Sequence, residues 1–208
     1  MRDMDGHDPA AGLPRIDDAA ILEALKETQA IRKGHFKLTS GRHSDTYIQC
    51  ARVLEHPRLT NKLAAEVVAR LPEDMSVDIV IAPAIGGILF GFAVAAALDR
   101  PFLFTERKDG FMMLRRSFEI PAGAHVLVAE DVVTTGSSVK EVCDLVADAG
   151  AVVQAVVSLI DRGGTPVFDA PFFPLLRLAT PSWAPEDCAL CAAGEGIDAP
   201  GSRQPLAL

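Results

Sequence analysis

Short apolar runs rich in β-branched residues alternate with segments of helical spacing through the middle of the chain. The strand-like runs cover residues 77–82, 102–105, 125–129, 152–160 and 172–179. Helical spacing of apolar residues covers 59–71, 86–98 and 139–146. Strands alternating with helices of this length indicate βαβ units, so we expect an α/β fold with a central, mostly parallel sheet flanked by helices. In such sheets ligands bind at the carboxyl ends of the strands.

The amino-terminal part and one central stretch depart from this alternation. Asp17 or Asp18 can cap a first helix whose apolar residues at 21, 22, 25 and 31 share one face, with Gly34 as its end. Residues 36–49 are polar, and we expect short strands there around the Ser40-Gly41 turn. The charged stretch 106–116 is interpreted as either a hairpin or a mobile loop.

The most specific pattern is the run Ala129-Glu-Asp-Val-Val-Thr-Thr-Gly-Ser-Ser138, which joins a predicted strand to a predicted helix. Glu130 and Asp131 come first, and 134–138 then offer hydroxyls and closely spaced N–H groups at the positive end of the helix. This order suits a ligand with hydroxyls at one end and a phosphate at the other, such as ribose 5-phosphate. The alternative, an ordinary helix with Ser138 and Glu141 as a capping box, leaves the paired acids unexplained.

This run resembles the phosphoribosyl-pyrophosphate (PRPP) motif of type I phosphoribosyltransferases. The resemblance implies that Glu130 and Asp131 hold the ribose hydroxyls. It also implies that the 5′-phosphate is bound by Thr134, Thr135, Gly136, Ser137 and Ser138. A second segment, Pro83-Ala-Ile-Gly-Gly87, resembles the pyrophosphate loop of the family, which implies that the diphosphate is bound by Ala84, Ile85, Gly86 and Gly87. Taken alone, paired glycines before an apolar helix indicate close helix–sheet packing equally well.

Two further segments are similar to orotate phosphoribosyltransferases. The run Phe36-Lys-Leu-Thr-Ser-Gly-Arg-His-Ser44 with Tyr47 resembles their amino-terminal signature, and Arg162 follows a predicted strand where the family carries an arginine for the orotate carboxylate. A guanidinium can fork onto a carboxylate. The implied orotate residues are Lys37, Tyr47, Thr134 and Arg162. Core packing of Tyr47 and an Asp161–Arg162 surface pair are the simpler alternatives.

Four cations stand close together at Arg107, Lys108, Arg115 and Arg116, in a chain whose net charge is −8. In orotate phosphoribosyltransferases an Arg-Lys pair after this strand contacts the diphosphate, often from the other subunit. Arg107 and Lys108 match that pair, which implies a homodimer with shared active sites. A solvated charge run is the alternative, and Arg115 and Arg116 stay unassigned.

The predicted function is therefore a magnesium-dependent orotate phosphoribosyltransferase of de novo pyrimidine (UMP) biosynthesis. It joins orotate to PRPP and gives orotidine 5′-monophosphate and pyrophosphate. The predicted catalytic residues are Glu130, Asp131, Arg107 and Lys108, and Mg²⁺ is expected on the PRPP diphosphate rather than directly on the protein. The alternatives are a purine or uracil phosphoribosyltransferase and a non-catalytic PRPP-sensing regulator.

Length and composition suit a single enzyme domain. We expect a disordered leader at 1–15, a phosphoribosyltransferase domain at 16–180 and a Pro/Gly-rich tail at 181–208. By the resemblance, a small hood is formed by 16–50 and part of the carboxyl terminus. The acidic charge disfavours nucleic acid as a partner, and neither a signal peptide nor a membrane-spanning run is visible, so a cytoplasmic location is expected.

Two patterns leave a question open. In better-studied relatives, lysines stand just before the Ser-Gly turn and in the pyrophosphate loop, and a long mobile loop covers the diphosphate. In this chain Thr39 takes the first of these lysine positions, a residue near Gly86 takes the second, and the loop is short. The sequence therefore does not predict which residues cover the diphosphate during the reaction. Cys188 and Cys191 form one Cys-x-x-Cys pair, which we interpret as reduced thiols. Structural zinc would need two further ligands, from a dimer mate or from histidines elsewhere.

Overall fold

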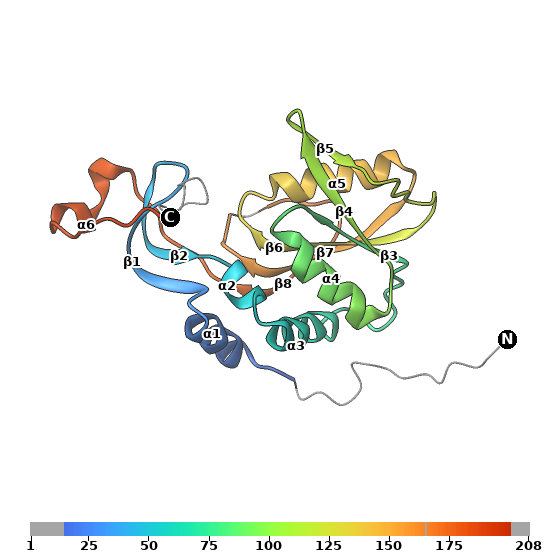
Figure 1. The fold of residues 1–208 in the computed structure, drawn as a ribbon, viewed down its shortest axis with the longest axis horizontal. Helices are drawn as coiled ribbons and strands as arrows, with labels where there is room; N and C mark the ends of the chain where they lie inside the picture. Colours follow the sequence, from blue (N-terminus) through green and yellow to red (C-terminus); the bar gives the residue numbers. More distant parts are fainter. Residues whose placement is uncertain (1–14, 165, 201–208) are drawn as a thin grey trace.

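A six-stranded sheet forms the centre of the molecule in the computed structural model, which describes residues 15–164 and 166–200 (Figure 1). Its strands are β3 (Ile79–Pro83), β4 (Phe102–Lys108), β5 (Phe111–Leu114), β6 (His125–Val133), β7 (Val152–Asp161) and β8 (Phe172–Arg177). The strand order is β5-β4-β3-β6-β7-β8, and only β5 runs antiparallel to its neighbour among these strands. The predicted α/β class with a mostly parallel sheet is confirmed.

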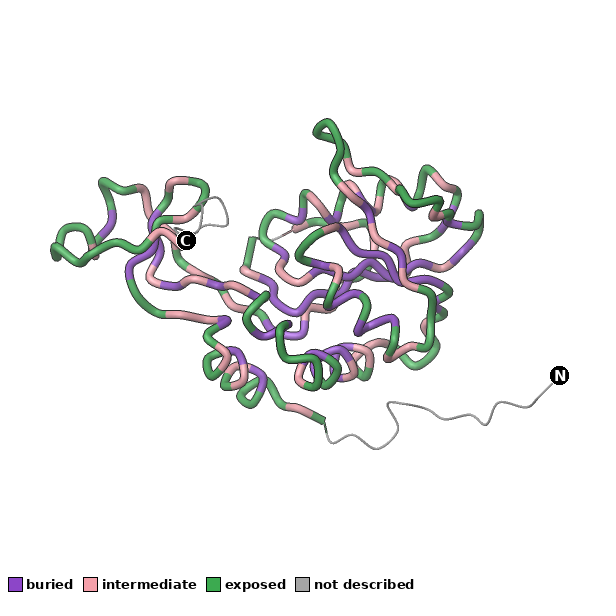
Figure 2. Tube along the Cα trace, viewed as in Figure 1, coloured by how far each residue is buried: buried purple, intermediate pink, exposed green. Residues whose placement is uncertain are grey.

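Helices cover both faces of this sheet. On one face lie α1 (Asp18–Glu27), the short α2 (Ala51–Leu54), α3 (Pro57–Val68) and α4 (Gly87–Leu98), and on the other lies α5 (Ser137–Asp148). The first face buries Leu63 and Phe90, and the second buries Val128 and Val142. Because both faces are covered, the central strands are buried along most of their length (Figure 2), which is why they read as continuous apolar runs in the sequence.

The order of the strands determines where a ligand can bind. The chain passes from β3 to β4 on one side, and then returns to place β6 on the other side of β3. Strands β3 and β6 are therefore parallel neighbours, with Ile79 opposite Val126. The loops that follow them meet at the point where the direction of winding changes, which is the usual ligand site of an open α/β sheet.

A second, two-stranded sheet lies at one end of the molecule (Figure 1). Its antiparallel strands are β1 (Ile31–Lys37) and β2 (His43–Ile48). The carboxyl-terminal segment returns to it through bridges between Phe36 and Asp198 and between His43 and Trp183. This segment carries a 3₁₀ turn at Pro185–Asp187 and the short helix α6 (Ala189–Ala192). The hood predicted from 16–50 and part of the carboxyl terminus includes this small sheet, which combines residues from both ends of the described chain.

Several predicted boundaries are wrong. The first helix ends at Glu27 rather than at Gly34, because the Thr28 hydroxyl binds the Ala24 carbonyl and Gln29 adopts a left-handed φ of 58°. Ile31 consequently belongs to β1. Strand β6 continues through the acids as far as Val133, because its pairing with β7 extends to that residue. The charged stretch 106–116 contains the β4–β5 hairpin, one of the two predicted alternatives.

The leader predicted at 1–15 falls almost wholly outside the described residues, as does the end of the tail at 201–208. Among the described helices, none combines the length and the apolar character that a membrane span requires.

Candidate active site

The loop after β3 lies directly against the acid pair of β6. A Cβ atom on Gly86 would lie 2.8 Å from Asp131 Oδ1, and a Cβ on Gly87 would lie 2.9 Å from Glu130 Oε1. A side chain at either position would therefore displace a carboxylate of the acid pair. The two motifs that the sequence places about forty residues apart form one surface at the switch point. Ala84 and Ile85 complete the loop; the peptide bond between them is cis, and the Ile85 side chain is exposed.

The two acids differ in environment. Glu130 is buried, and its Oε1 accepts the Asp131 N–H at 3.0 Å. Burial raises the pKa of Glu130 to about 9, and the neighbouring charge of Asp131 adds to the shift. Asp131 is half-buried, and its Oδ1 accepts the Val132 N–H at 2.8 Å. The protonated form of Glu130 is therefore favoured in the ligand-free protein, and Asp131 is the more accessible acid.

The turn after β6 leaves the start of α5 open to an anion. Gly136 precedes the helix with a left-handed φ of 79° and has no side chain with which to cap it. The hydroxyls of Thr135 and Ser137 lie 2.9 Å apart at this turn. The alternative capping box fails, because the Glu141 carboxylate binds the Arg107 guanidinium at 2.7 Å instead of the helix start. Hydroxyls and backbone N–H groups at a positive helix end provide the donors that a phosphate needs.

A cleft of about 580 Å³ lies beside this turn. It brings together all four predicted orotate residues: Lys37 from β1, Tyr47 from β2, Thr134 from the turn after β6 (residues 134–138, here called the phosphate turn) and Arg162 directly after β7. The other lining residues are Leu38, Thr39, Ser40, Ile48, Thr135, Gly164, Thr180, Ser182 and Pro200. Its volume is in the range of small-molecule sites. Since Thr134 and Thr135 also belong to the phosphate turn, the cleft and the turn are continuous.

Arg162 is positioned by a residue that the sequence did not identify. Its Nε and Nη2 both donate to Thr180 Oγ1 at 3.1 Å. Thr180 follows β8, and the parallel register of β7 and β8 brings it beside Arg162; no local sequence signal marks it. The alternative Asp161–Arg162 pair is not formed, because Asp161 accepts the Gly163 N–H and pairs with Arg177 at 3.5 Å. Among the described residues, Arg162 has no carboxylate partner within ion-pair distance.

Partial burial gives Arg162 and Tyr47 perturbed environments. It lowers the pKa of Arg162 and raises the pKa of Tyr47. The Tyr47 ring is tilted against that of Phe36, with centroids 5.6 Å apart. Tyr47 therefore packs on the small sheet, as the simpler interpretation expects, and also lines the cleft.

The two cations predicted to bind the diphosphate, Arg107 and Lys108, do not line the 580 Å³ cleft. Both are at the tip of the β4–β5 hairpin, which projects beyond the sheet (Figure 1). Arg107 contacts α5 through Glu141, and both cations are exposed. Arg115 and Arg116 pair with Glu106, which gives them a structural partner. Among the described residues, neither Arg107 nor Lys108 forms an ion pair with Glu130 or Asp131.

Comparisons with known proteins agree with this geometry. Residues 51–184 match the family model described as the phosphoribosyl transferase domain. The chain is 47% identical over 185 residues to an orotate phosphoribosyltransferase of Heliobacterium modesticaldum, covering 88% of this chain and 97% of that protein. It is also 47% identical over 184 residues to the orotate phosphoribosyltransferase of Thermotoga maritima, covering 88% and 98%.

Solved structures support the fold. Orotate phosphoribosyltransferase from Aeropyrum pernix superposes with a TM-score of 0.63 at 24% identity, covering 76% of this chain and 93% of that one. An adenine phosphoribosyltransferase superposes with a TM-score of 0.61 at 21% identity, covering 74% and 99%. The fold alone therefore does not distinguish the base, whereas the sequence relatives do. The chain belongs to the phosphoribosyltransferase family and, within it, to the orotate phosphoribosyltransferases.

Proposed function

We propose that the protein joins N1 of orotate to C1 of PRPP and releases pyrophosphate, the step that forms orotidine 5′-monophosphate in de novo pyrimidine biosynthesis. The observation that carries the proposal is Arg162, a half-buried guanidinium that lines the cleft and has hydroxyl but no carboxylate partners among the described residues. Orotate brings a carboxylate that can pair with it, whereas uracil and the purine bases do not.

The same surface suits the sugar phosphate. The turn at 134–138 provides donors for the 5′-phosphate, and the acid pair lies between this turn and the loop of Gly86 and Gly87. The N1–C1 bond forms as the bond between C1 and the diphosphate oxygen breaks; the leaving group takes that electron pair, and the N1 proton of orotate is lost to solvent or to the released pyrophosphate. Positive charge then develops on the ribose ring. Asp131, the more accessible carboxylate, stabilises this charge through the sugar hydroxyls, and Glu130 joins it once ionised.

Magnesium is the cofactor that we propose for the diphosphate. The Asp131 carboxylate lies against the pyrophosphate loop, and carboxylate oxygens are hard ligands of the kind that Mg²⁺ prefers. When bound with the diphosphate, the ion would neutralise part of the leaving group's charge. Asp131 would contact it through water, and the direct ligands would come from PRPP and solvent.

We also propose a homodimer. Within one chain Arg107 pairs with Glu141 of α5, and Arg107 and Lys108 stand on a projecting hairpin, from which they can reach a neighbouring subunit. Ile85, Leu89 and Phe92 recur at helical spacing and expose apolar side chains, with exposed fractions of 85%, 54% and 62%. An apolar surface of this kind is typical of protein–protein contacts. The four cysteines are all free, which suits a cytoplasmic location.

A substrate panel tests the function. The protein with PRPP and Mg²⁺ should convert orotate and leave uracil, hypoxanthine and adenine nearly unchanged, as followed by base consumption and pyrophosphate release. Preferred use of uracil or a purine base would contradict the orotate assignment. Binding of PRPP without turnover of any base would support a PRPP-sensing regulator instead.

A further inference from the structure

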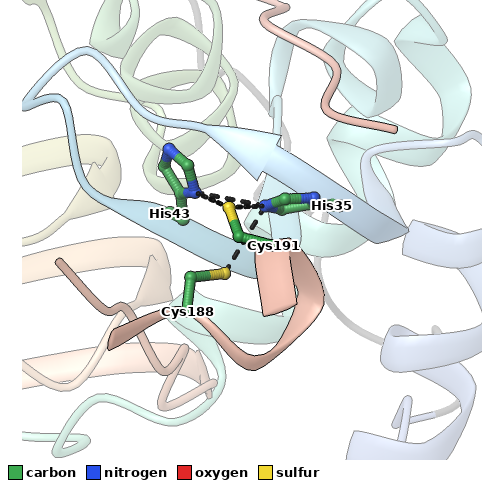
Figure 3. A group of neighbouring side chains, drawn as sticks. All are labelled: His35, His43, Cys188 and Cys191. Carbon is green, nitrogen blue, oxygen red and sulfur yellow. Dashed lines mark hydrogen bonds between the residues drawn. The ribbon is translucent and has the colours of Figure 1, made fainter. Parts of the chain in front are cut away.

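Four metal-ligating side chains meet outside the active site (Figure 3). His35 comes from β1, His43 from β2, and Cys188 and Cys191 from the carboxyl-terminal segment around α6. Their ligand atoms all lie within 4.8 Å of one another. His35, His43 and Cys188 are buried, with exposed fractions of 5%, 7% and 2%. The sequence places the two pairs about 150 residues apart, so only folding brings them together.

Ordinary hydrogen bonds do not account for this convergence. His35 Nδ1 lies 3.0 Å from the Glu195 carbonyl, which can only accept, so Nδ1 carries the proton and Nε2 presents a lone pair. Three atoms approach that single lone pair: His43 Nδ1 at 3.1 Å, and the sulfurs of Cys188 and Cys191 at 3.5 Å each. One lone pair can accept only one good hydrogen bond. The two ring nitrogens and the two sulfurs are instead gathered within 4.8 Å of one another.

The spacing fits a tetrahedral metal ion. Zinc bonds of about 2.0–2.3 Å to nitrogen and sulfur place neighbouring ligand atoms about 3.3–3.8 Å apart. Four of the six separations between these atoms are 3.1, 3.2, 3.5 and 3.5 Å, and all six are within 4.8 Å. We propose that His35, His43, Cys188 and Cys191 bind one structural Zn²⁺ ion. Two thiolates and two imidazoles suit zinc, whereas Mg²⁺ and Ca²⁺ prefer oxygen ligands.

The ion is structural rather than catalytic, because four protein ligands fill a tetrahedral site and leave no position for substrate. Its role follows from what it connects. A two-stranded sheet is marginally stable by itself, and α6 is four residues long with no buried residue. The ion ties these two weak elements together, and the Glu195 carbonyl orients the His35 ring in the way that outer partners of metal ligands do.

The zinc site also supports one wall of the cleft. Lys37 lies two residues after His35 on β1, and Ser182 lies next to Trp183, which pairs with His43. Lys37 and Ser182 both line the cleft. The ion therefore positions the wall without contacting the ligand.

Metal analysis of the full-length chain tests this inference, with the protein purified without chelators or nickel affinity. Mass spectrometry of the elements should find about one zinc per chain. The Cys188→Ser/Cys191→Ser variant and the His43→Ala variant should fall below about a tenth of that amount. Cys143→Ser and His125→Ala, which change a thiol and an imidazole outside the cluster, should retain zinc fully.

Wild-type protein keeps the inference testable if the variants do not fold. Removal of zinc with a strong chelator should lower the Tm, and Zn²⁺ but not Mg²⁺ should restore it. Addition of Co²⁺ to the metal-free protein should give the visible absorption of a tetrahedral cobalt site with thiolate ligands. A wild-type protein without transition metal, with Cys188 and Cys191 either as free thiols or joined in a disulfide, would overturn the proposal.

Discussion

Replacement of Arg162 by alanine should weaken orotate binding far more than PRPP binding. A guanidinium has five N–H donors. Thr180 Oγ1 receives two of them, from Nε and Nη2, each at 3.1 Å. The edge formed by Nη1 and the second Nη2 hydrogen therefore stays open for a two-pronged contact with the orotate carboxylate.

The magnitude follows from this geometry. Hydrogen bonds to charged groups contribute about 1.5–3 kcal/mol each, and the loss of one partner leaves a partly buried anion unmatched. Arg162 is only half-buried, so solvent screens the pair, and we expect a total loss of about 2–4 kcal/mol. This corresponds to an increase of about 30- to 1,000-fold in the orotate concentration required. Lysine at this position should recover only part of the loss, because it lacks the planar fork.

Steady-state kinetics with orotate and PRPP varied separately measure this effect. Arg177→Ala is the matched control, because Arg177 is a nearby exposed arginine that pairs with Asp161 and does not line the cleft. Its orotate requirement should change little. If Arg162→Ala retained the wild-type orotate requirement, the carboxylate contact would be refuted and a purine or uracil substrate would become the better assignment.

Three further predictions concern PRPP. Asp131→Asn should keep the fold, as judged by circular dichroism, and lower turnover by about one to three orders of magnitude, because one electrostatic stabiliser is lost; near-normal turnover would remove its role. Arg107→Ala and Lys108→Ala should each raise the PRPP concentration needed for half-maximal rate by about 5- to 30-fold. An effect confined to orotate would show that the hairpin does not contact the diphosphate. Burial raises the pKa of Glu130 to about 9, which favours its protonated form in the free protein. If bound ribose requires the ionised form, PRPP binding expels that proton, so PRPP affinity should rise by up to about tenfold per pH unit between about pH 7 and 9. Calorimetry in buffers of different ionisation heat should detect the released proton, and Glu130→Gln should abolish the pH dependence.

The sequence was most informative where contacts are local or periodic. Strand and helix alternation predicted the central sheet, and the position of the acid pair and the phosphate turn followed from one continuous run. The end of α1 was mistaken, because Ile31 continues the helical spacing although its side chain belongs to β1. A single apolar residue fits both the helical spacing and the alternation of a strand, and the pairing of Ile31 with β2 decides for the strand.

Long-range pairings were beyond the reach of the sequence. Cys188 and Cys191 were visible as a pair, but their histidines were not assigned. His35 and His43 become diagonal neighbours only through the β1–β2 register, in which Lys37 lies opposite His43. Thr180 likewise meets Arg162 only through the register of β7 and β8. Neither relation leaves a periodic signal in the chain.

The pairing of the small sheet with residues near 183 and 198 has a consequence for shortened forms of the chain. Lys37 is made early, yet its N–H binds the Asp198 carbonyl, and His43 exchanges backbone hydrogen bonds with Trp183. The central sheet, by contrast, is complete once β8 has been made at Arg177. The central sheet therefore depends on residues up to 177, whereas the pairing of the small sheet also requires residues 183 and 198. We expect a chain truncated after about residue 180 to keep the surface proposed for PRPP and to lose the support that residues 183 and 198 give to the small sheet beside the cleft.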